Sequence, residues 1–351
     1  MHVDEENRVD VRTNDPPPTT PYATVASCGP LRLRRYLPPD GAPDDAPPVL
    51  IVYPLVKRPF IVDLIAGRSV VRTLQAQGLS VYLTDWAPPG PQDTALGFDE
   101  YVNTFLVAAI NEIRQREGVP RVALIGCCCG AVLSAIYAAL HPFDVERLVT
   151  FATPLEGRPV IGSATAEFLR SFHGNIPAWV LRPLLNGRVP TRFHLAALLA
   201  RDLGEPEMAQ VHFDEPPPLL PAVERWLGSD VPVAGKVFVE MIRNVLGERR
   251  LAENRLRVGG VRVDLGRIDC PLLSLSGVRD ELVTPRCGAL LAELVGSAES
   301  RHWMFPSGHL GLMIGSYAHR ELWPRVGEWL HGREWSLEHS QFVGKQSQGA
   351  P

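Results

Sequence analysis

The chain has 351 residues, of which 45% are hydrophobic and 21% are charged, a composition typical of a globular protein. Its formal net charge is −4 and its acidic and basic residues are interleaved, which argues against a nucleic-acid-binding protein. Residues 1–21 lack the apolar core of a secretory signal peptide, so the six cysteines are expected to be reduced thiols of a cytoplasmic protein.

Apolar runs and helical periodicity alternate along the first half of the chain. Residues 1–24 are polar and rich in proline, and we expect them to form a disordered tail. Beyond them, short apolar runs that suit buried parallel strands alternate with segments in which apolar residues recur every three or four positions. The expected strands are 48–53, 80–86, 121–125 and 147–151, and the expected helices lie near 68–78, 102–113 and before Leu140.

The alternation stops near residue 155 and resumes after 245, so we interpret 155–245 as a helical cap or lid inserted into the sheet. The expected later elements are strands at 271–276 and 301–305 and helices near 286–295 and 316–331. This order predicts a mostly parallel, doubly wound α/β sheet, with a core of 25–154 and 246–334 and a disordered tail at 335–351.

The longest uncharged run extends from Val122 to Leu140 and has two interpretations. A run of this length is a candidate membrane span. Gly126, Gly130 and Ser134 interrupt it, however, and it lies between elements of an α/β domain. We therefore expect a strand, a turn and a helix, and no transmembrane segment.

Three consecutive cysteines lie between two glycines in this run, Gly126-Cys127-Cys128-Cys129-Gly130. A strand followed by Gly-x-nucleophile-x-Gly and a helix is the nucleophile elbow of the α/β-hydrolase fold, because small residues on both sides let strand and helix approach closely. Adjacent cysteines cannot easily surround a tetrahedral zinc ion, whereas buried cysteines as core filler are an alternative. We expect Cys128 to be the nucleophile and the backbone N–H of Cys129 to face the oxyanion.

A nucleophilic thiol needs a base and a group that orients the base. In this fold the order along the chain is nucleophile, acid, histidine. Asp280 follows a predicted strand where the acid belongs, and His309 follows the last predicted strand where the base belongs. Glu281 is a competing carboxylate, and His302 is a competing base that lies within a strand pattern and is therefore expected to be structural.

From about residue 30 to 332 the sequence resembles the polyhydroxyalkanoate synthases, in particular the short catalytic subunit of the class III enzymes. Some matching segments lie in the cap and after the first strand, which generic hydrolases do not share. The segments are 50-LIVYPLVKRPFIVDL-64, 68-RSVVRTLQAQGLSVYLTDW-86, the cysteine pentad, 174-GNIPAW-179, 262-RVDLGRIDCPLL-273, 280-DELVTP-285 and 306-PSGHLG-311.

The resemblance implies an acyltransferase that polymerises (R)-3-hydroxyacyl-CoA into a polyester and releases CoA. Cys128 would carry the acyl group as a thioester, His309 would deprotonate Cys128 or the incoming hydroxyl, and Asp280 would assist His309. The backbone N–H of Val56 would be the second oxyanion donor. The resemblance further implies no metal or prosthetic group, a nascent polyester chain, a companion synthase subunit, a homo-oligomer and a location on the polyester granule surface.

Several neighbours of the catalytic positions depart from the family pattern. Ala131 replaces a second glycine, and Cys127 and Cys129 replace residues that are commonly Ile or Tyr and Gln. Lys57 stands where Asn is usual, and Glu281 stands where His is usual. The three catalytic positions themselves match.

Two other functions fit the same residues. A cysteine-dependent thioesterase or acyltransferase of secondary metabolism would use the same acyl-enzyme but resolve it with water or another acceptor. A non-catalytic granule-associated scaffold would keep the fold and lose a member of the triad, and no member is lost here.

Overall fold

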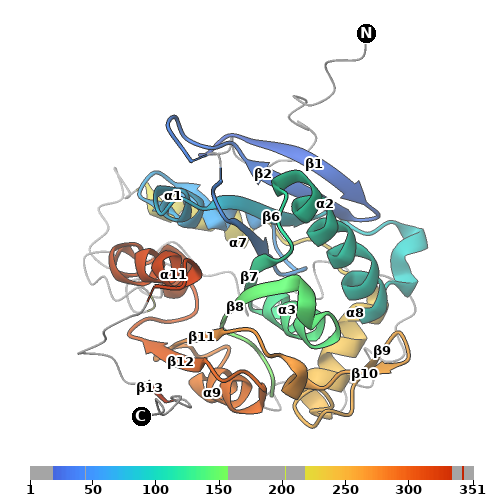
Figure 1. The fold of residues 1–351 in the computed structure, drawn as a ribbon. Helices are drawn as coiled ribbons and strands as arrows, with labels where there is room; N and C mark the ends of the chain where they lie inside the picture. The colour runs from blue at the N-terminus through green and yellow to red at the C-terminus, as the bar shows by residue number, and fades with distance from the viewer. Residues whose placement is uncertain (1–18, 44, 157–201, 203–217, 334–341, 344–351) are drawn as a thin grey trace.

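The computed structural model describes residues 19–43, 45–156, 202, 218–333 and 342–343 (Figure 1). Within these residues the central feature is a nine-stranded sheet in which six adjacent strands, β6 to β12 in spatial order, run parallel. The predicted α/β class with a mostly parallel sheet is confirmed. The strands in spatial order are β1 (Tyr22–Cys28), β2 (Leu31–Tyr36), β6 (Ser80–Trp86), β3 (Pro48–Val52), β7 (Val122–Cys127), β8 (Val145–Phe151), β11 (Leu272–Gly277), β12 (Ser300–Phe305) and β13 (Phe342–Val343).

Helices cover both faces of this sheet. The described α-helices are α1 (Val70–Ala76), α2 (Val107–Glu117), α3 (Cys129–Leu140), α7 (Leu219–Leu227), α8 (Gly235–Glu240), α9 (Pro285–Leu294), α10 (Gly311–Ile314) and α11 (Trp323–Leu330). Short 3-10 or π-helical segments are η1 (Pro59–Val62), η2 (Pro91–Ala95), η3 (Glu100–Leu106), η4 (Pro142–Asp144), η6 (Met241–Gly247), η7 (Leu265–Arg267) and η8 (Ala318–Leu322). Two small strand pairs lie outside the sheet, β4 (Asp63–Ile65) with β5 (Arg68–Ser69) and β9 (Arg257–Val258) with β10 (Val261–Arg262).

The central strands are buried on both faces, which explains their nearly continuous apolar sequences. In β3, Leu50 and Val52 point into the core that includes residues of α2, α3 and α9. Val49 and Ile51 point into the opposite core, which includes residues of α1, α10 and α11. Figure 1 shows α1 and α11 on one side of the sheet and α2 and α3 on the other.

An N-terminal antiparallel hairpin, β1 with β2, extends the sheet beyond β6 and was not predicted from the sequence. β1 begins at Tyr22, inside the expected tail of 1–24, and the Thr20 amide and hydroxyl donate to the Asp63 carboxylate at 2.6 and 3.0 Å. In β2 the buried Arg34 guanidinium is paired with the Asp85 carboxylate. The arginines of β2 at 32, 34 and 35 indicate an exposed segment when the sequence is considered alone, because the sequence does not show that Arg34 has a buried acidic partner.

The uncharged run divides into β7 and the twelve-residue helix α3, as expected. Among the described residues, no helix combines the length and the apolar character needed to span a bilayer. Of the predicted cap, 155–245, most residues lie outside the described ones, and so does 174-GNIPAW-179. The end of that segment is described: α7 packs against η1 and β4, and α8 packs against η2. The limits of the cap and of the C-terminal tail, 335–351, remain predictions, although Phe342 and Val343 within that tail form β13 beside β12.

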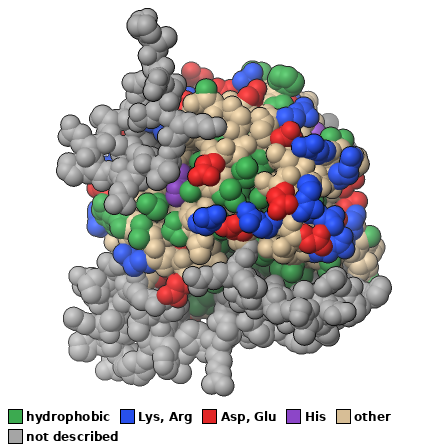
Figure 2. Space-filling view, turned by 90° about the horizontal axis from the view of Figure 1, so that it is seen from below, with side chains coloured by type: hydrophobic (Ala, Val, Ile, Leu, Met, Phe, Trp, Pro, Cys, Tyr) green, Lys and Arg blue, Asp and Glu red, His purple; other side chains and the backbone are tan. Residues whose placement is uncertain are grey.

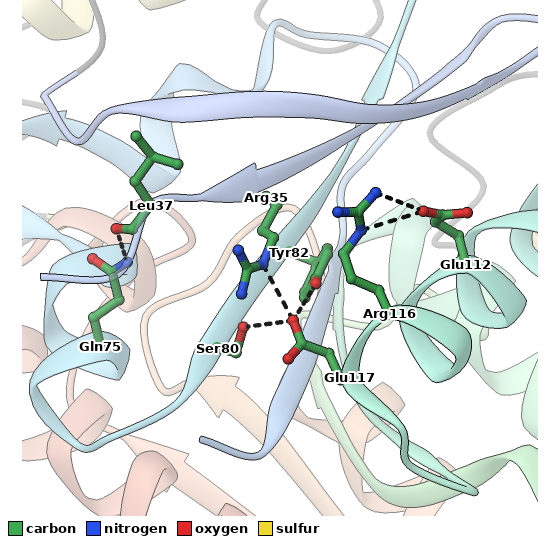
Figure 3. Close-up of polar contacts among 8 residues, drawn as sticks. All are labelled: Arg35, Leu37, Gln75, Ser80, Tyr82, Glu112, Arg116 and Glu117. Atoms are coloured by element: carbon green, nitrogen blue, oxygen red, sulfur yellow. Dashed lines mark hydrogen bonds and ion pairs between the residues drawn. The ribbon is translucent and has the colours of Figure 1, made fainter. Parts of the chain in front are cut away.

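Charged residues of both signs share the described surface. In Figure 2, acidic and basic side chains are interspersed on the face shown. At the edge where the parallel strands begin, Glu117 at the end of α2 accepts hydrogen bonds from Arg35 Nε and Ser80 Oγ, both at 3.2 Å, and from the Tyr82 hydroxyl (Figure 3). We refer to Arg35, Ser80, Tyr82 and Glu117 as the Glu117 cluster.

Candidate active site

Cys128 occupies the sharp turn between β7 and α3. Its backbone angles are φ 48° and ψ −118°, outside the regions that L-residues favour. The Cys128 amide donates to the Phe151 carbonyl at 2.9 Å, and the Cys128 carbonyl accepts from the Ala131 amide at 2.9 Å. These bonds hold the strained residue at the carboxyl ends of the strands, where its half-buried thiol stands at the start of α3.

The two glycines of the pentad are required by packing. A Cβ atom on Gly130 would lie 2.1 Å from the Val52 carbonyl oxygen, and one on Gly126 would lie 2.4 Å from the Ala131 Cα. Both obstacles are backbone atoms, which cannot turn away as a flexible side chain can. Gly126 and Gly130 therefore let α3 lie directly against β7 and β3, as the elbow pattern predicts.

Asp280 and His309 lie together on neighbouring strand-end loops. Asp280 follows β11 and His309 follows β12, and Asp280 Oδ2 is 2.7 Å from His309 Nδ1. The other carboxylate oxygen, Oδ1, accepts from the amides of Leu282 at 2.9 Å and Val283 at 2.8 Å, and the Asp280 side chain is fully buried. A carboxylate fixed in this way holds the ring with Nδ1 toward Asp280 and leaves Nε2 for another partner.

That partner is the Cys128 thiol, which lies near enough to the His309 ring for each group to shift the pKa of the other. Burial disfavours a charged ring, but the hydrogen bonds and charges of Asp280 and Cys128 outweigh it, so the pKa of His309 is raised well above its ordinary value. A hydrogen bond with Cys129 and burial raise the pKa of the Cys128 thiol, and His309 acts in the opposite direction. The thiol and the imidazole therefore shift the pKa of each other, as expected of a nucleophile and the base beside it.

The two flanking cysteines occupy different environments. Cys127 is the last residue of β7 and is buried, and burial raises the pKa of its thiol. Cys129 is the first residue of α3, and its hydrogen bond with Cys128 lowers the pKa of its thiol. Only Cys128, of the three, interacts with His309 in the described part of the chain.

Val56, the predicted second oxyanion donor, lies in the loop after β3. Its carbonyl oxygen accepts from the Val231 amide at 3.3 Å. Its own N–H has no hydrogen-bond acceptor among the described residues. Because β3 and β7 are adjacent and parallel, this loop and the Cys128 turn leave the same edge of the sheet.

The sequence and the fold of the chain are similar to those of known proteins. The family model described as the alpha/beta hydrolase fold matches residues 47–316. The subunit PhaC of poly(3-hydroxyalkanoate) polymerase from Allochromatium vinosum is 32% identical over 90% of this chain and 89% of that protein. The protein of the same name from Haloarcula marismortui is 33% identical over 86% of this chain and 64% of that protein. The chain belongs to the poly(3-hydroxyalkanoate) polymerase family.

Solved structures support the fold of this polymerase-family member. The enol-lactonase from Burkholderia xenovorans LB400 superimposes with a TM-score of 0.54 at 15% identity and covers 89% of this chain and 100% of its own. The monoacylglycerol lipase from Paleococcus ferrophilus gives a TM-score of 0.53 at 18% identity, over 82% and 96%. The α/β-hydrolase fold and the family resemblance inferred from the sequence are therefore confirmed.

The competing residues lie in different environments. Glu281 is exposed, whereas Asp280 beside it is buried against His309. His302 is 1% exposed within β12, its Nε2 is 3.0 Å from Ser276 Oγ, and burial lowers its pKa to about 4. A ring in this setting supports β12 from the core side, in line with the structural role expected for it.

Sequence reasoning missed Asp202, a residue of the predicted cap that contacts the His309 loop of this polymerase-family chain. Its carbonyl oxygen accepts from the Gly308 amide and its Oδ2 from the Gly311 amide, both at 2.7 Å. Burial raises the pKa of this carboxyl, while the bond from Gly311 opposes the shift. A Cβ atom on Gly308 would overlap the Asp202 carboxylate, which accounts for a glycine before His309. No local pattern around Asp202 signals this role.

Proposed function

We propose that this chain is an acyltransferase that polymerises (R)-3-hydroxyacyl-CoA into polyhydroxyalkanoate, with Cys128 as the residue that carries the acyl group. The proposal depends chiefly on one observation: a thiol on a strained elbow contacts an imidazole that a buried carboxylate holds in place. Membership of the polymerase family supports the substrate class, a hydroxyacyl thioester of CoA.

In the acylation step, His309 takes the proton of Cys128 and the sulfur attacks the thioester carbonyl of the substrate. The oxyanion of the tetrahedral intermediate would accept from the N–H groups of Cys129 and Val56. When the intermediate collapses, the bond to the CoA sulfur breaks and the CoA thiolate takes the proton from His309. The products are acyl-Cys128 and free CoA, and His309 is neutral again.

In the elongation step, the 3-hydroxyl group of another hydroxyacyl-CoA loses its proton to His309, and its oxygen attacks the acyl-Cys128 thioester. The carbon–sulfur bond to Cys128 breaks, and the leaving thiolate is reprotonated by His309. The product is an ester one unit longer that still carries CoA, and it can acylate Cys128 again. Each cycle adds one ester bond and releases one CoA, and its steps use only side-chain and backbone groups of this chain.

The partners expected from the family belong to the same proposal. These are the nascent polyester chain, a companion synthase subunit and a second copy of this chain, with the polyester granule surface as the place of action. Addition of a candidate companion subunit should then raise the rate of CoA release at a fixed concentration of this chain.

The proposal is tested by incubating the protein with 3-hydroxybutyryl-CoA, quenching in acid and measuring the intact mass, followed by peptide mapping. We expect an acyl adduct on the peptide that contains Cys128, CoA release, and polymer. Continuous CoA release with free 3-hydroxybutyrate and no polymer would replace the polymerase with a thioesterase, and absence of both CoA release and adduct would leave only a scaffold.

The neighbouring cysteines provide matched controls. Cys128→Ala is expected to abolish adduct and CoA release with the melting temperature unchanged, whereas Cys127→Ala and Cys129→Ala should retain much of the activity, because only Cys128 contacts His309. Equal loss of activity in all three variants would contradict the assignment of Cys128 as the nucleophile.

A further inference from the structure

A buried ion pair joins the Val56 loop to the segment that follows α7. The Lys57 ammonium lies 2.5 Å from Asp230 Oδ1, and both side chains are at least 95% buried. Lys57 Nζ also donates to the Leu227 carbonyl at 2.7 Å and lies 5.3 Å from the centroid of the Trp226 ring. Lysine is rarely buried unless its charge is paired, so this ammonium is held in place by Asp230 and the carbonyl together.

The backbone on both sides of Lys57 is bonded to the same segment. Lys57 and Asp230 face each other in an isolated antiparallel bridge. The Val231 amide donates to the Val56 carbonyl and the Arg58 amide donates to the Ser229 carbonyl, both at 3.3 Å. In this arrangement the facing residues are close and their side chains lie on the same side, which places the ammonium beside the carboxylate.

Trp226 adds a second attachment of the loop. Its indole N–H is shared between the Arg58 carbonyl at 3.0 Å and the Tyr53 hydroxyl at 3.1 Å. Tyr53 follows β3 and is 3% exposed. The loop from Tyr53 to Arg58 is therefore fixed at its start, at its end and on both sides of Lys57.

We propose that Lys57 is a positioning residue that holds the Val56 N–H toward the oxyanion of the reaction, through its ion pair with Asp230. The inference rests on the proposed function, because it needs Val56 to be an oxyanion donor. The ammonium of Lys57 contacts Asp230, the Leu227 carbonyl and the Trp226 ring, so Lys57 is assigned a positioning role and no step of the reaction.

The orientation of the peptide before Val56 decides whether the Val56 N–H can act as a donor. The Val56 N–H belongs to the Leu55–Val56 peptide, and the next two peptides of the chain make the hydrogen bonds that flank Lys57. Both bonds are long, at 3.3 Å, so the side-chain ion pair helps them to hold Val56 from its carbonyl side. An oxyanion donor acts only when its N–H is already aimed at the site where charge develops, and loss of one such donor costs about 10²–10³-fold in kcat. A donor that is present but poorly aimed should cost less, about 10- to 100-fold.

The test uses the double variant Lys57→Met with Asp230→Asn, which removes both charges and leaves no unpaired buried charge. We expect kcat for CoA release from 3-hydroxybutyryl-CoA to fall by about 10- to 100-fold with KM changed by less than about threefold. Glu117→Gln is the control, because the Glu117 cluster is a hydrogen-bonded group at the opposite edge of the sheet. The kcat of Glu117→Gln should stay within about twofold of the wild-type value, even if its melting temperature falls as much as that of the double variant.

A folded double variant with the kcat of the wild type would overturn the inference, and so would an equal fall of kcat in Glu117→Gln. If this double variant does not fold, Lys57→Gln with Asp230→Asn, which carries no buried charge and can keep a hydrogen bond, must lower kcat at least about threefold at constant KM. The two proposals fail separately: a wild-type protein without acyl-Cys128 and CoA release refutes the proposed function. An active wild type whose kcat survives loss of the ion pair refutes only the role of Lys57.

Discussion

Gly130→Ala is the most direct test of how the elbow is built. The new Cβ atom would lie 2.1 Å from the Val52 carbonyl oxygen, whereas ordinary contact begins at 3.4 Å, so α3 and β3 would have to separate by about 1.3 Å. β3 is hydrogen-bonded to β6 on one side and β7 on the other and cannot move alone. Overpacking costs about 1–3 kcal/mol where the core can adjust, and against a fixed backbone we expect about 3 kcal/mol.

The corresponding shift in melting temperature follows from the size of the chain. Unfolding entropy of about 2.1 cal/mol/K per residue gives about 0.7 kcal/mol/K for 351 residues, so a loss of about 3 kcal/mol lowers the melting temperature by about 4 °C. Differential scanning calorimetry measures this shift, and CoA release measures the displacement of Cys128. Gly228→Ala is the control, because its nearest neighbour would be 3.5 Å away and its φ is −79°. A Gly130→Ala protein as stable and as active as Gly228→Ala would refute the packing argument.

Three further predictions concern the chemistry of the site. The kcat/KM of the wild type should fall at acid pH with an apparent pKa above the ordinary 6.5, because His309 must be neutral to act as base and its pKa is raised. In Asp280→Asn the pKa of His309 falls, so the acid limb of the pH–rate profile should move to lower pH. The plateau of kcat/KM should be reduced by about 10²–10⁴-fold. An acid limb unmoved by Asp280→Asn would contradict this. Cys128→Ser should show little CoA release in the same assay, since a hydroxyl is far harder to deprotonate than a thiol; activity equal to the wild type would show that the sulfur is not needed. Asp202→Ala should remove the carboxylate that accepts from the Gly311 amide, while the backbone carbonyl that accepts from the Gly308 amide remains. We expect the free energy of unfolding to fall by about 1–3 kcal/mol in denaturant titrations, together with kcat. Unchanged values of both would mean that the loop holds its position without the Asp202 carboxylate.

The parallel part of the sheet could be predicted from the sequence because strands buried on both faces are nearly continuous apolar runs. The predicted strand 80–86 coincides with β6 (Ser80–Trp86), and the run ending at Leu140 coincides with the end of α3. The N-terminal hairpin could not be predicted in this way. Arg34 in β2 is buried because it pairs with Asp85, which lies in another strand, and nothing near Arg34 in the sequence reveals that partner.

The same distinction applies to the site. Cys128, Asp280 and His309 were predicted because each follows a recognisable strand in an order that the fold imposes. Asp202 and the ion pair of Lys57 with Asp230 depend on contacts between segments far apart in the chain, with no periodicity or motif at either end. Such residues become apparent only when the loops are seen together in three dimensions.

During synthesis, the segment that forms the Cys128 elbow leaves the ribosome before the segments that carry Asp280 and His309. Asp280 follows β11, which pairs with β8, and His309 follows β12, which pairs with β11. A nascent polypeptide that ends before β12 therefore lacks the imidazole that lies beside Cys128. If His309 is the base of the proposed reaction, such an incomplete translation product cannot sequester an acyl group on Cys128.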